Sequence, residues 1–316
     1  MENSTQIVSF VLTAYGHSGH MRYLYFTILM SSYLSIICAN TMLIGVICGE
    51  GSLHEPMYLL LCGLFVNEVY GSTIIFPCFM TQMFSDTHEV SFIFCLLQLF
   101  CLYTYGTVEY CNLAAMAYDR YVSICHPLHY SIIMTTGKVC SVLLLVWLYS
   151  LMKSTLTVII IVHQKFCGNQ IDKVICEPTK MACSISAGNN VFTMAAGFVS
   201  FAVPLIPILF SYIKILAVCL RTSREARQKA VSTCCPQLVS LANFAIACFF
   251  EVLQSKVEMT HVPSSLRIIL SVYLLVCQPL LSPIIYGLNL TRIRTVCKNI
   301  CLKKQMVLKD TGVKSI

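Results

Sequence analysis

Residues 116–130 read MAYDRYVSICHPLHY and close an apolar stretch that begins near residue 92. The stretch is long enough to cross the hydrocarbon core of a bilayer, which takes about 20 residues of helix. The ionisable pair Asp119 and Arg120 therefore falls at the predicted end of a membrane span. Charges at such a boundary are costly unless they are paired or hydrated, so the pair indicates a functional switch, although a snorkelling anchor would explain it equally well.

The composition indicates that lipid surrounds most of the chain. Of the 316 residues, 57% are hydrophobic and 11% are charged, and the mean hydropathy is +0.76, which is too apolar for an ordinary soluble domain. We predict an all-α integral membrane protein with one domain over 1–302 and a tail over 303–316. Apolar stretches that can span a bilayer with some tilt occur at 24–48, 57–80, 92–122, 139–161, 191–219, 231–254 and 267–288.

Lysine and arginine residues predict the orientation. If the amino terminus is outside, most basic residues fall on the inner side, as the positive-inside rule requires. These residues are Arg120, Lys138, Lys214, Arg221, Arg224, Arg227, Lys229, Arg292, Arg294, Lys298, Lys303, Lys304, Lys309 and Lys314. We expect a multi-pass plasma-membrane protein with an outer amino terminus and an inner carboxyl terminus. The net charge of +7 then reflects orientation and attraction to anionic lipid, and not binding to nucleic acid.

Short segments near the two ends suggest anchoring or modification. The first residues, MENSTQ, have no basic region before the first apolar stretch, so we expect that span to act as a signal anchor without a cleaved peptide. Asn3 begins a glycosylation sequon, which suits an outer amino terminus. Residues 290–302 are basic and apolar and predict a short amphipathic helix on the inner leaflet. Cys297 and Cys301 in it are palmitoylation candidates or, equally, two unmodified thiols.

The string at 116–130 resembles the third-span signature of odorant receptors, which are rhodopsin-like G-protein-coupled receptors. Gln237 stands where that family usually has a histidine, and Ser282 replaces the usual asparagine before Pro283. NEVYGS at 67–72 resembles the fish-type branch, which suggests a water-soluble ligand. Further matching motifs follow in the family's order: Asn40, LHEPMY at 53–58, Ser211 and Tyr212, KAVSTCCPQL at 229–238, and PIIYGLN at 283–289.

The resemblance implies a seven-transmembrane helix bundle of the rhodopsin-like type that binds a small odorant and activates a heterotrimeric G protein. In this family the G protein is the olfactory stimulatory type, which raises cyclic AMP. In the inactive state, Arg120 would hold the inner ends of the third and sixth spans together, and it would contact the G protein after the sixth span moves outward. The implied switch residues are Asp119, Arg120, Tyr121, Tyr212, Pro283 and Tyr286.

Four cysteines in the outer polar regions are candidates for disulfides. Cys95 lies at the outer mouth of the third span, and Cys167, Cys176 and Cys183 lie in the loop at 162–190. By themselves these four residues allow three pairings. The resemblance selects Cys95 with Cys176, which would tie the loop over the bundle, and Cys167 with Cys183 inside the loop.

Two glutamates lie deep in predicted spans. Glu68 stands where the wider family has an aspartate, and Glu109 stands where odorant receptors also carry a glutamate. A buried carboxylate must pair, hydrate or take up a proton, so two on neighbouring spans suggest a cation site or a shared proton. The simpler interpretation is that Glu68 is hydrated and Glu109 is hydrogen-bonded to a neighbouring span. The resemblance favours a sodium ion, and we expect no other metal or cofactor.

The predicted ligand site lies in the outer half of the bundle. Residues one to three turns below Cys95 recur at 3/4 spacing and should share one face of the third span. Each is as readily a packing residue, but as a set they predict a small, mostly apolar pocket with few polar groups. The set is Tyr103, Gly106, Thr107 and Tyr110, with Ser200, Cys248, Val252 and Val272 facing it from other spans.

Three other functions would also fit a membrane protein of this size. A receptor of the same fold with a non-olfactory role would differ in its site of expression. An ion-coupled transporter would also use buried acids, but the sequence has no inverted repeat and no helices broken by Gly or Pro in matching halves. An intramembrane enzyme is disfavoured because we find no nucleophile motif, HExxH helix or phosphate loop.

Overall fold

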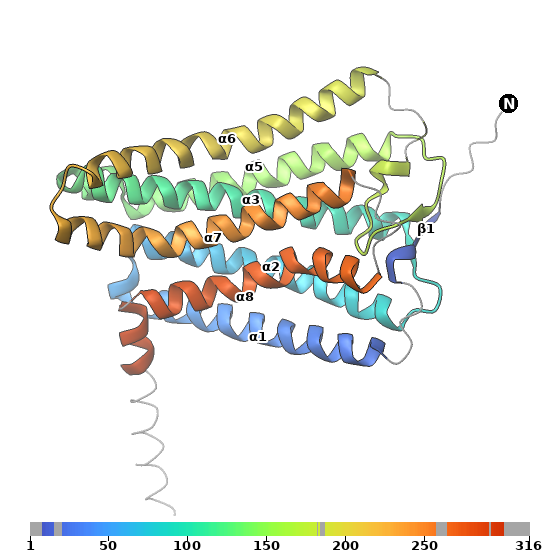
Figure 1. Cartoon of the computed structure of the whole chain (residues 1–316), viewed down its shortest axis with the longest axis horizontal. Helices are drawn as coiled ribbons and strands as arrows, with labels where there is room; N and C mark the ends of the chain where they lie inside the picture. Colours follow the sequence, from blue (N-terminus) through green and yellow to red (C-terminus); the bar gives the residue numbers. More distant parts are fainter. Residues whose placement is uncertain are drawn as a thin grey trace, which may run out of the picture.

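The computed structural model describes residues 8–15, 21–181, 183, 187–256, 264–290 and 292–299. Within these residues, seven long helices lie side by side as a bundle (Figure 1). Six of them, all except α8, are long and apolar enough over their described residues to cross a membrane. The fold is therefore the seven-helix membrane bundle. The helices are α1 Met21–Gly49, α2 Pro56–Phe84, α3 Phe92–Cys125, α5 Thr136–Val162, α6 Ala187–Cys219, α7 Arg224–Lys256 and α8 Ser264–Asn289.

Several helices run past the apolar stretches that predict them. The largest difference is in α7, which begins at Arg224 although its apolar stretch begins at 231. The intervening residues, REARQKA, are good helix formers in water, so the helix continues where its apolar character ends. A short helix, α4 Tyr130–Ile133, follows α3. Residues 292–299 are also helical and turn away from the end of α8 (Figure 1, red).

The helix α3 lies at the centre of the bundle, where it packs against α2, α5, α6 and α7. The outward face of α5 exposes leucines, including Leu144 and Leu145 at 61% and 63%. In water such an apolar face would promote aggregation. Lipid tails are as apolar as leucine, so exposing this face to lipid carries no such cost. The central position of α3 therefore gives it contacts with four other long helices.

Asn40 of α1 satisfies a backbone group that a proline in α8 leaves unpaired. Pro283 has no backbone N–H, so the carbonyl of Pro279, four residues earlier, loses its helical partner. The fully buried Asn40 donates its Nδ2 amide to that carbonyl at 3.1 Å. The contact explains why an asparagine in the first span and a proline in the seventh occur together.

A small sheet covers one end of the bundle, which we call the Cys95 end. Its strands are β1 Ser9–Leu12, β2 Glu89–Ser91 and β3 Gln170–Ile171, in the order β2-β1-β3. β1 pairs antiparallel with β2 and parallel with β3. The sequence does not predict this sheet, because strands of two to four residues have no measurable periodicity.

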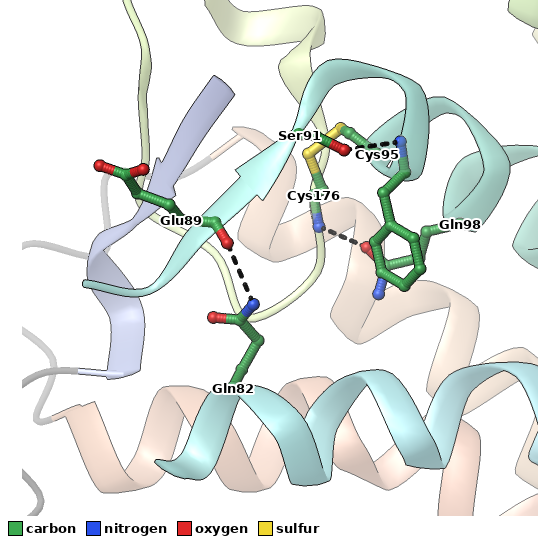
Figure 2. Close-up of a disulfide and its surroundings, with 7 residues drawn as sticks. Gln82, Glu89, Ser91, Cys95, Gln98 and Cys176 are labelled. Atoms are coloured by element: carbon green, nitrogen blue, oxygen red, sulfur yellow. Dashed lines mark hydrogen bonds between the residues drawn. A yellow bond between two sulfur atoms is a disulfide. The ribbon is translucent and has the colours of Figure 1, made fainter. Parts of the chain in front are cut away.

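Two disulfides hold the loop after α5 against the Cys95 end. Cys95 is bonded to Cys176, and Cys167 is bonded to Cys183, which are the two pairs that the resemblance implies. Gln98, one turn below Cys95, accepts a hydrogen bond from the backbone N–H of Cys176 at 3.2 Å (Figure 2). The loop is thus fixed to the first turn of α3 by both a covalent bond and a hydrogen bond.

Replacing Cys95 or Cys176 with serine should lower the amount of folded protein at the cell surface to a similar extent, because either change opens the same bridge. The double variant should be no worse than the single ones. Flow cytometry of an amino-terminal tag measures this, with Cys38→Ser, an exposed free thiol, as the control. A double variant far below both single variants would show that the two residues act independently.

Candidate functional site

The two buried glutamates lie on neighbouring helices, Glu68 on α2 and Glu109 on α3. Glu68 and Glu109 are both 0% exposed. The carboxylate of Glu68 accepts hydrogen bonds from the hydroxyls of Tyr105 at 2.9 Å and Ser282 at 3.1 Å. That of Glu109 accepts from the amides of Asn67 and Gln278, each at 2.9 Å. Every carboxylate oxygen therefore has a neutral donor, and neither acid pairs with a cation within the described residues.

The network continues from Glu109 into the last two long helices. Gln278 of α8 also donates to the hydroxyl of Ser240 at 2.9 Å, and it accepts from Asn243 of α7 at 2.5 Å. Asn243 in turn accepts from the hydroxyl of Tyr273 at 2.8 Å. The polar chain joins α2, α3, α7 and α8. Sequence reasoning missed these partners, although amides inside apolar stretches are themselves a signal of buried polar contacts.

One buried oxygen beside the acids lacks a donor. Asn67 is fully buried, and its Nδ2 serves both Glu109 and the carbonyl of Tyr105, but its Oδ1 has no hydrogen-bond partner within the described residues. Leaving an acceptor unsatisfied costs about 1–3 kcal/mol. Two carboxylates and an idle amide oxygen form a set of oxygen ligands of the kind that hard cations bind. These residues have the ligand chemistry that a small cation takes, although four neutral donors already serve the carboxylates in this arrangement.

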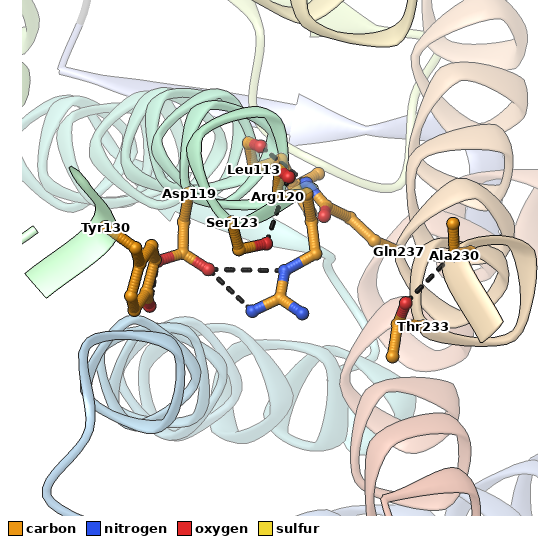
Figure 3. Close-up of polar contacts among 8 residues, drawn as sticks. All are labelled: Leu113, Asp119, Arg120, Ser123, Tyr130, Ala230, Thr233 and Gln237. Carbon is orange, nitrogen blue, oxygen red and sulfur yellow. Dashed lines mark hydrogen bonds and ion pairs between the residues drawn. The ribbon is translucent and has the colours of Figure 1, made fainter. Parts of the chain in front are cut away.

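Asp119 and Arg120 pair with each other at the opposite end, which we call the Arg120 end. The guanidinium donates to Oδ2 of Asp119 at 2.6 Å, and the hydroxyl of Tyr130 donates to Oδ1 at 2.8 Å (Figure 3). Burial and the adjacent carboxylate of Asp119 raise the pKa of Tyr130, so its hydroxyl remains a donor. The carboxylate is thus fixed between α3 and α4.

The link between α3 and α7 differs from the one that the resemblance implies. Within the described part of the chain, the guanidinium of Arg120 makes no hydrogen bond or ion pair with α7, and its Nε and Nη2 both donate to Asp119. Instead, the buried Gln237 of α7 donates to the carbonyl of Leu113 at 3.0 Å (Figure 3). A hydrogen bond from an uncharged side-chain amide holds the two helices together here. The implied ionic contact is not formed in this arrangement.

A cleft opens beside Arg120 between four helices. Its walls come from α2, α3, α7 and α8 and include Asp119, Arg120, Gln237 and Tyr286. Nearby, the hydroxyl of Tyr212 on α6 is buried and has no hydrogen-bond partner among the described residues. Tyr121 faces away from this cleft, with its ring edge-on to Phe210 of α6 at 5.4 Å between centroids. The implied switch residues are therefore brought to one end but not into one cluster.

The predicted ligand residues on α3 do not all face the same neighbour. Tyr110 stacks on Phe244 of α7 at 5.7 Å between ring centroids. Thr107 instead faces α5, where its Oγ1 accepts from the ammonium group of Lys153 at 3.0 Å, and it donates to the carbonyl of Tyr103. Lys153 was missed because one lysine does not interrupt a long apolar stretch. Cys248 is half-buried, and the side chains of Ser200, Val252 and Val272 lie outside those that the structure describes.

The helical segment 292–299 is attached to the start of α2. Arg292 forms an ion pair with Glu55, which immediately precedes α2, and this contact raises the pKa of the arginine. Cys297 lies in this segment and is half-buried. Cys301 and Asn3 lie outside the described residues.

Replacing Gly71 with alanine should destabilise the bundle by about 1–3 kcal/mol, because the added methyl group would overlap the buried ring of Tyr105 and displace the donor to Glu68. Thermal melting of the purified protein measures the change. Gly45→Ala on α1 meets no atom within 4 Å and is the matched control. Equal melting temperatures for the two variants would contradict tight packing around Tyr105.

Comparison with known proteins places the chain in a family. The family model for olfactory receptors matches residues 29–304. The chain is 31% identical to human olfactory receptor 10A3, over 91% of its length and 92% of that protein. It is 32% identical to human olfactory receptor 6Y1, over 92% and 90%, and 32% identical to the dog olfactory receptor-like protein OLF4, over 92% and 94%. The chain therefore belongs to the olfactory receptor family of multi-pass plasma-membrane, G-protein-coupled receptors, which is not a family of enzymes.

Proposed function

We propose that the protein is an odorant receptor that binds a small odorant in the Cys95 half of its bundle. The bound receptor activates a heterotrimeric G protein of the olfactory stimulatory type at the Arg120 end and raises cyclic AMP. The observation that carries this proposal is the cleft at the Arg120 end, where a paired arginine lies among four helices. Family membership supports the receptor class.

The Arg120 end faces the cytoplasm in this proposal, with the amino terminus outside and the carboxyl terminus inside. Basic residues support this orientation, since Arg221 lies between α6 and α7, Arg224 and Arg227 lie at the start of α7, and Arg292 and Arg294 follow α8. Cytoplasmic loops carry such an excess of lysine and arginine. The disulfide-linked loop then lies on the oxidising side of the membrane.

Activation exchanges contacts inside the bundle for contacts with the G protein. An outward movement of α7 breaks the bond from Gln237 to Leu113 and uncovers Arg120. The unpaired hydroxyl of Tyr212 supports a second arrangement in which it gains a partner, because a buried hydroxyl without one is costly. The odorant drives the change only by binding the open arrangement more tightly than the closed one.

Arg120→Ala should remove the cyclic AMP response to odorants while leaving surface expression largely intact, because the guanidinium acts at the inner end. A reporter assay with odorant mixtures, in cells that express the olfactory stimulatory G protein, measures the response. Arg224→Ala, which removes an exposed basic residue from the same end, is the matched control. A normal response in Arg120→Ala would rule out the role given to this residue.

In this proposal, the buried acids bind a sodium ion in the inactive arrangement. The idle Oδ1 of Asn67 and the two carboxylates of Glu68 and Glu109 would hold it. Two ionised carboxylates repel in a medium of low dielectric constant, so a cation or a shared proton must lie between them. An ion that prefers the inactive state weakens agonist binding, and the agonist weakens ion binding by the same factor.

Odorant potency should therefore rise when sodium is replaced isosmotically by a large organic cation, and Glu68→Gln and Glu109→Gln should each remove this dependence. Dose-response curves for cyclic AMP measure the potency. Glu89→Gln, an exposed acid at the Cys95 end, should keep the wild-type behaviour. A wild-type potency that does not change with sodium would leave the acids as a proton-sharing or structural pair.

A further inference from the structure

The most unusual charge in the bundle is Lys153, in the middle of α5. It lies nine residues before the end of the helix at Val162, or about 14 Å along the axis. Its ammonium group does not extend toward that end, because it donates sideways to Oγ1 of Thr107 on α3 at 3.0 Å. The lysine is therefore not a snorkelling anchor for the membrane surface.

The direction of Lys153 follows from the packing of α5. Trp147 lies edge-on to Tyr70 of α2, with ring centroids 5.4 Å apart. Six residues later the helix has turned by about 600°, so Lys153 points roughly 120° away from Trp147. It occupies the flank of α5 that is turned from α2 and approaches the face of α3 bearing Thr107.

No described carboxylate in the spans neutralises this lysine. Glu68 and Glu109 accept from neutral side chains in the network with α8, and Asp119 is paired with Arg120. The hydroxyl of Thr107 is neutral, so it solvates the ammonium group without cancelling its charge. Lys153 is half-buried in the middle of a span, where a cation without an anion is costly and marks a functional position in a membrane protein.

A further observation indicates a ligand at this place. Gly106, which precedes Thr107 on α3, would meet no described atom within 4 Å if it carried a Cβ. The contact between α3 and α5 thus combines a cation with open space.

We propose that Lys153 binds the carboxylate of an acidic odorant, with the apolar part of the ligand in the space beside Gly106. The proposal rests on the proposed function and names its ligand class as small organic acids. A carboxylate supplies the anionic partner that Lys153 lacks. An ester of the same shape supplies only neutral acceptors, and the ammonium group would stay uncompensated.

The experiment uses the full-length receptor, purified and reconstituted in nanodiscs of zwitterionic lipid. The probes are butanoate, hexanoate, octanoate and benzoate, each compared with its own methyl ester, and the readout is the melting temperature as a function of probe concentration. At least one acid should raise the melting temperature of the wild type saturably while its ester does not.

Lys153→Met should weaken binding of this acid by roughly tenfold or more, since it removes one partner of the charge pair between ligand and receptor. Lys153→Arg should retain part of the binding. Gly106→Leu should also weaken binding, by filling the space and leaving the charge. Lys165→Met removes an exposed charge just beyond the same helix and should behave as wild type. If Lys153→Met does not fold, Lys153→Arg and Gly106→Leu still decide the outcome.

The proposal is overturned if no acid stabilises the wild type beyond its ester, or if the effect survives in Lys153→Met as it does in Lys165→Met. Cyclic AMP assays keep it separate from the proposed function. An acid that stabilises the receptor through Lys153 without any signal would contradict the proposed function alone. If no acid stabilises the wild type, while neutral odorants signal equally through the wild type and Lys153→Met, the result would contradict this inference alone.

Discussion

Hydrocarbon offers no hydrogen-bond partner to a peptide group, so every backbone amide and carbonyl in the spans must be satisfied inside the protein. Helices meet this condition except where a proline removes a donor. Pro283 removes such a donor, and Asn40 of another helix replaces it by donating to the carbonyl of Pro279. The seventh span can therefore bend near its Arg120 end while its freed backbone oxygen remains paired with the first span.

The same constraint acts on side chains and decides how the helices are joined. Glu68 and Glu109 cannot reach water, so they recruit hydroxyls and amides from α2, α3 and α8, and the chain of donors continues to Asn243 on α7. These contacts are directional, unlike packing between leucines and lipid-like surfaces. A movement of α7 or α8 must break specific bonds, which favours two discrete arrangements over a continuous range.

Sequence alone predicts the helices because the hydrocarbon thickness sets their length, and it selects Arg120 and the two acids as candidate site residues because charges in membrane spans are rare. It does not predict contacts that depend on helix rotation. Thr107 and Tyr110 were expected on one face, yet they meet α5 and α7 respectively. Lys153 was passed over inside an apolar stretch, and the start of α7 at Arg224 was missed because helix propensity continues beyond the lipid.

The two departures from the family motifs each make a contact suited to their place. Ser282 has a shorter side chain than asparagine, but its hydroxyl reaches Glu68 at 3.1 Å, so the seventh span keeps a bond to the second. Gln237 replaces a histidine, whose charge would change near neutral pH. An amide has no such transition. The hydrogen bond from Gln237 to Leu113 therefore holds α7 against α3 with a strength that does not depend on the protonation of its side chain.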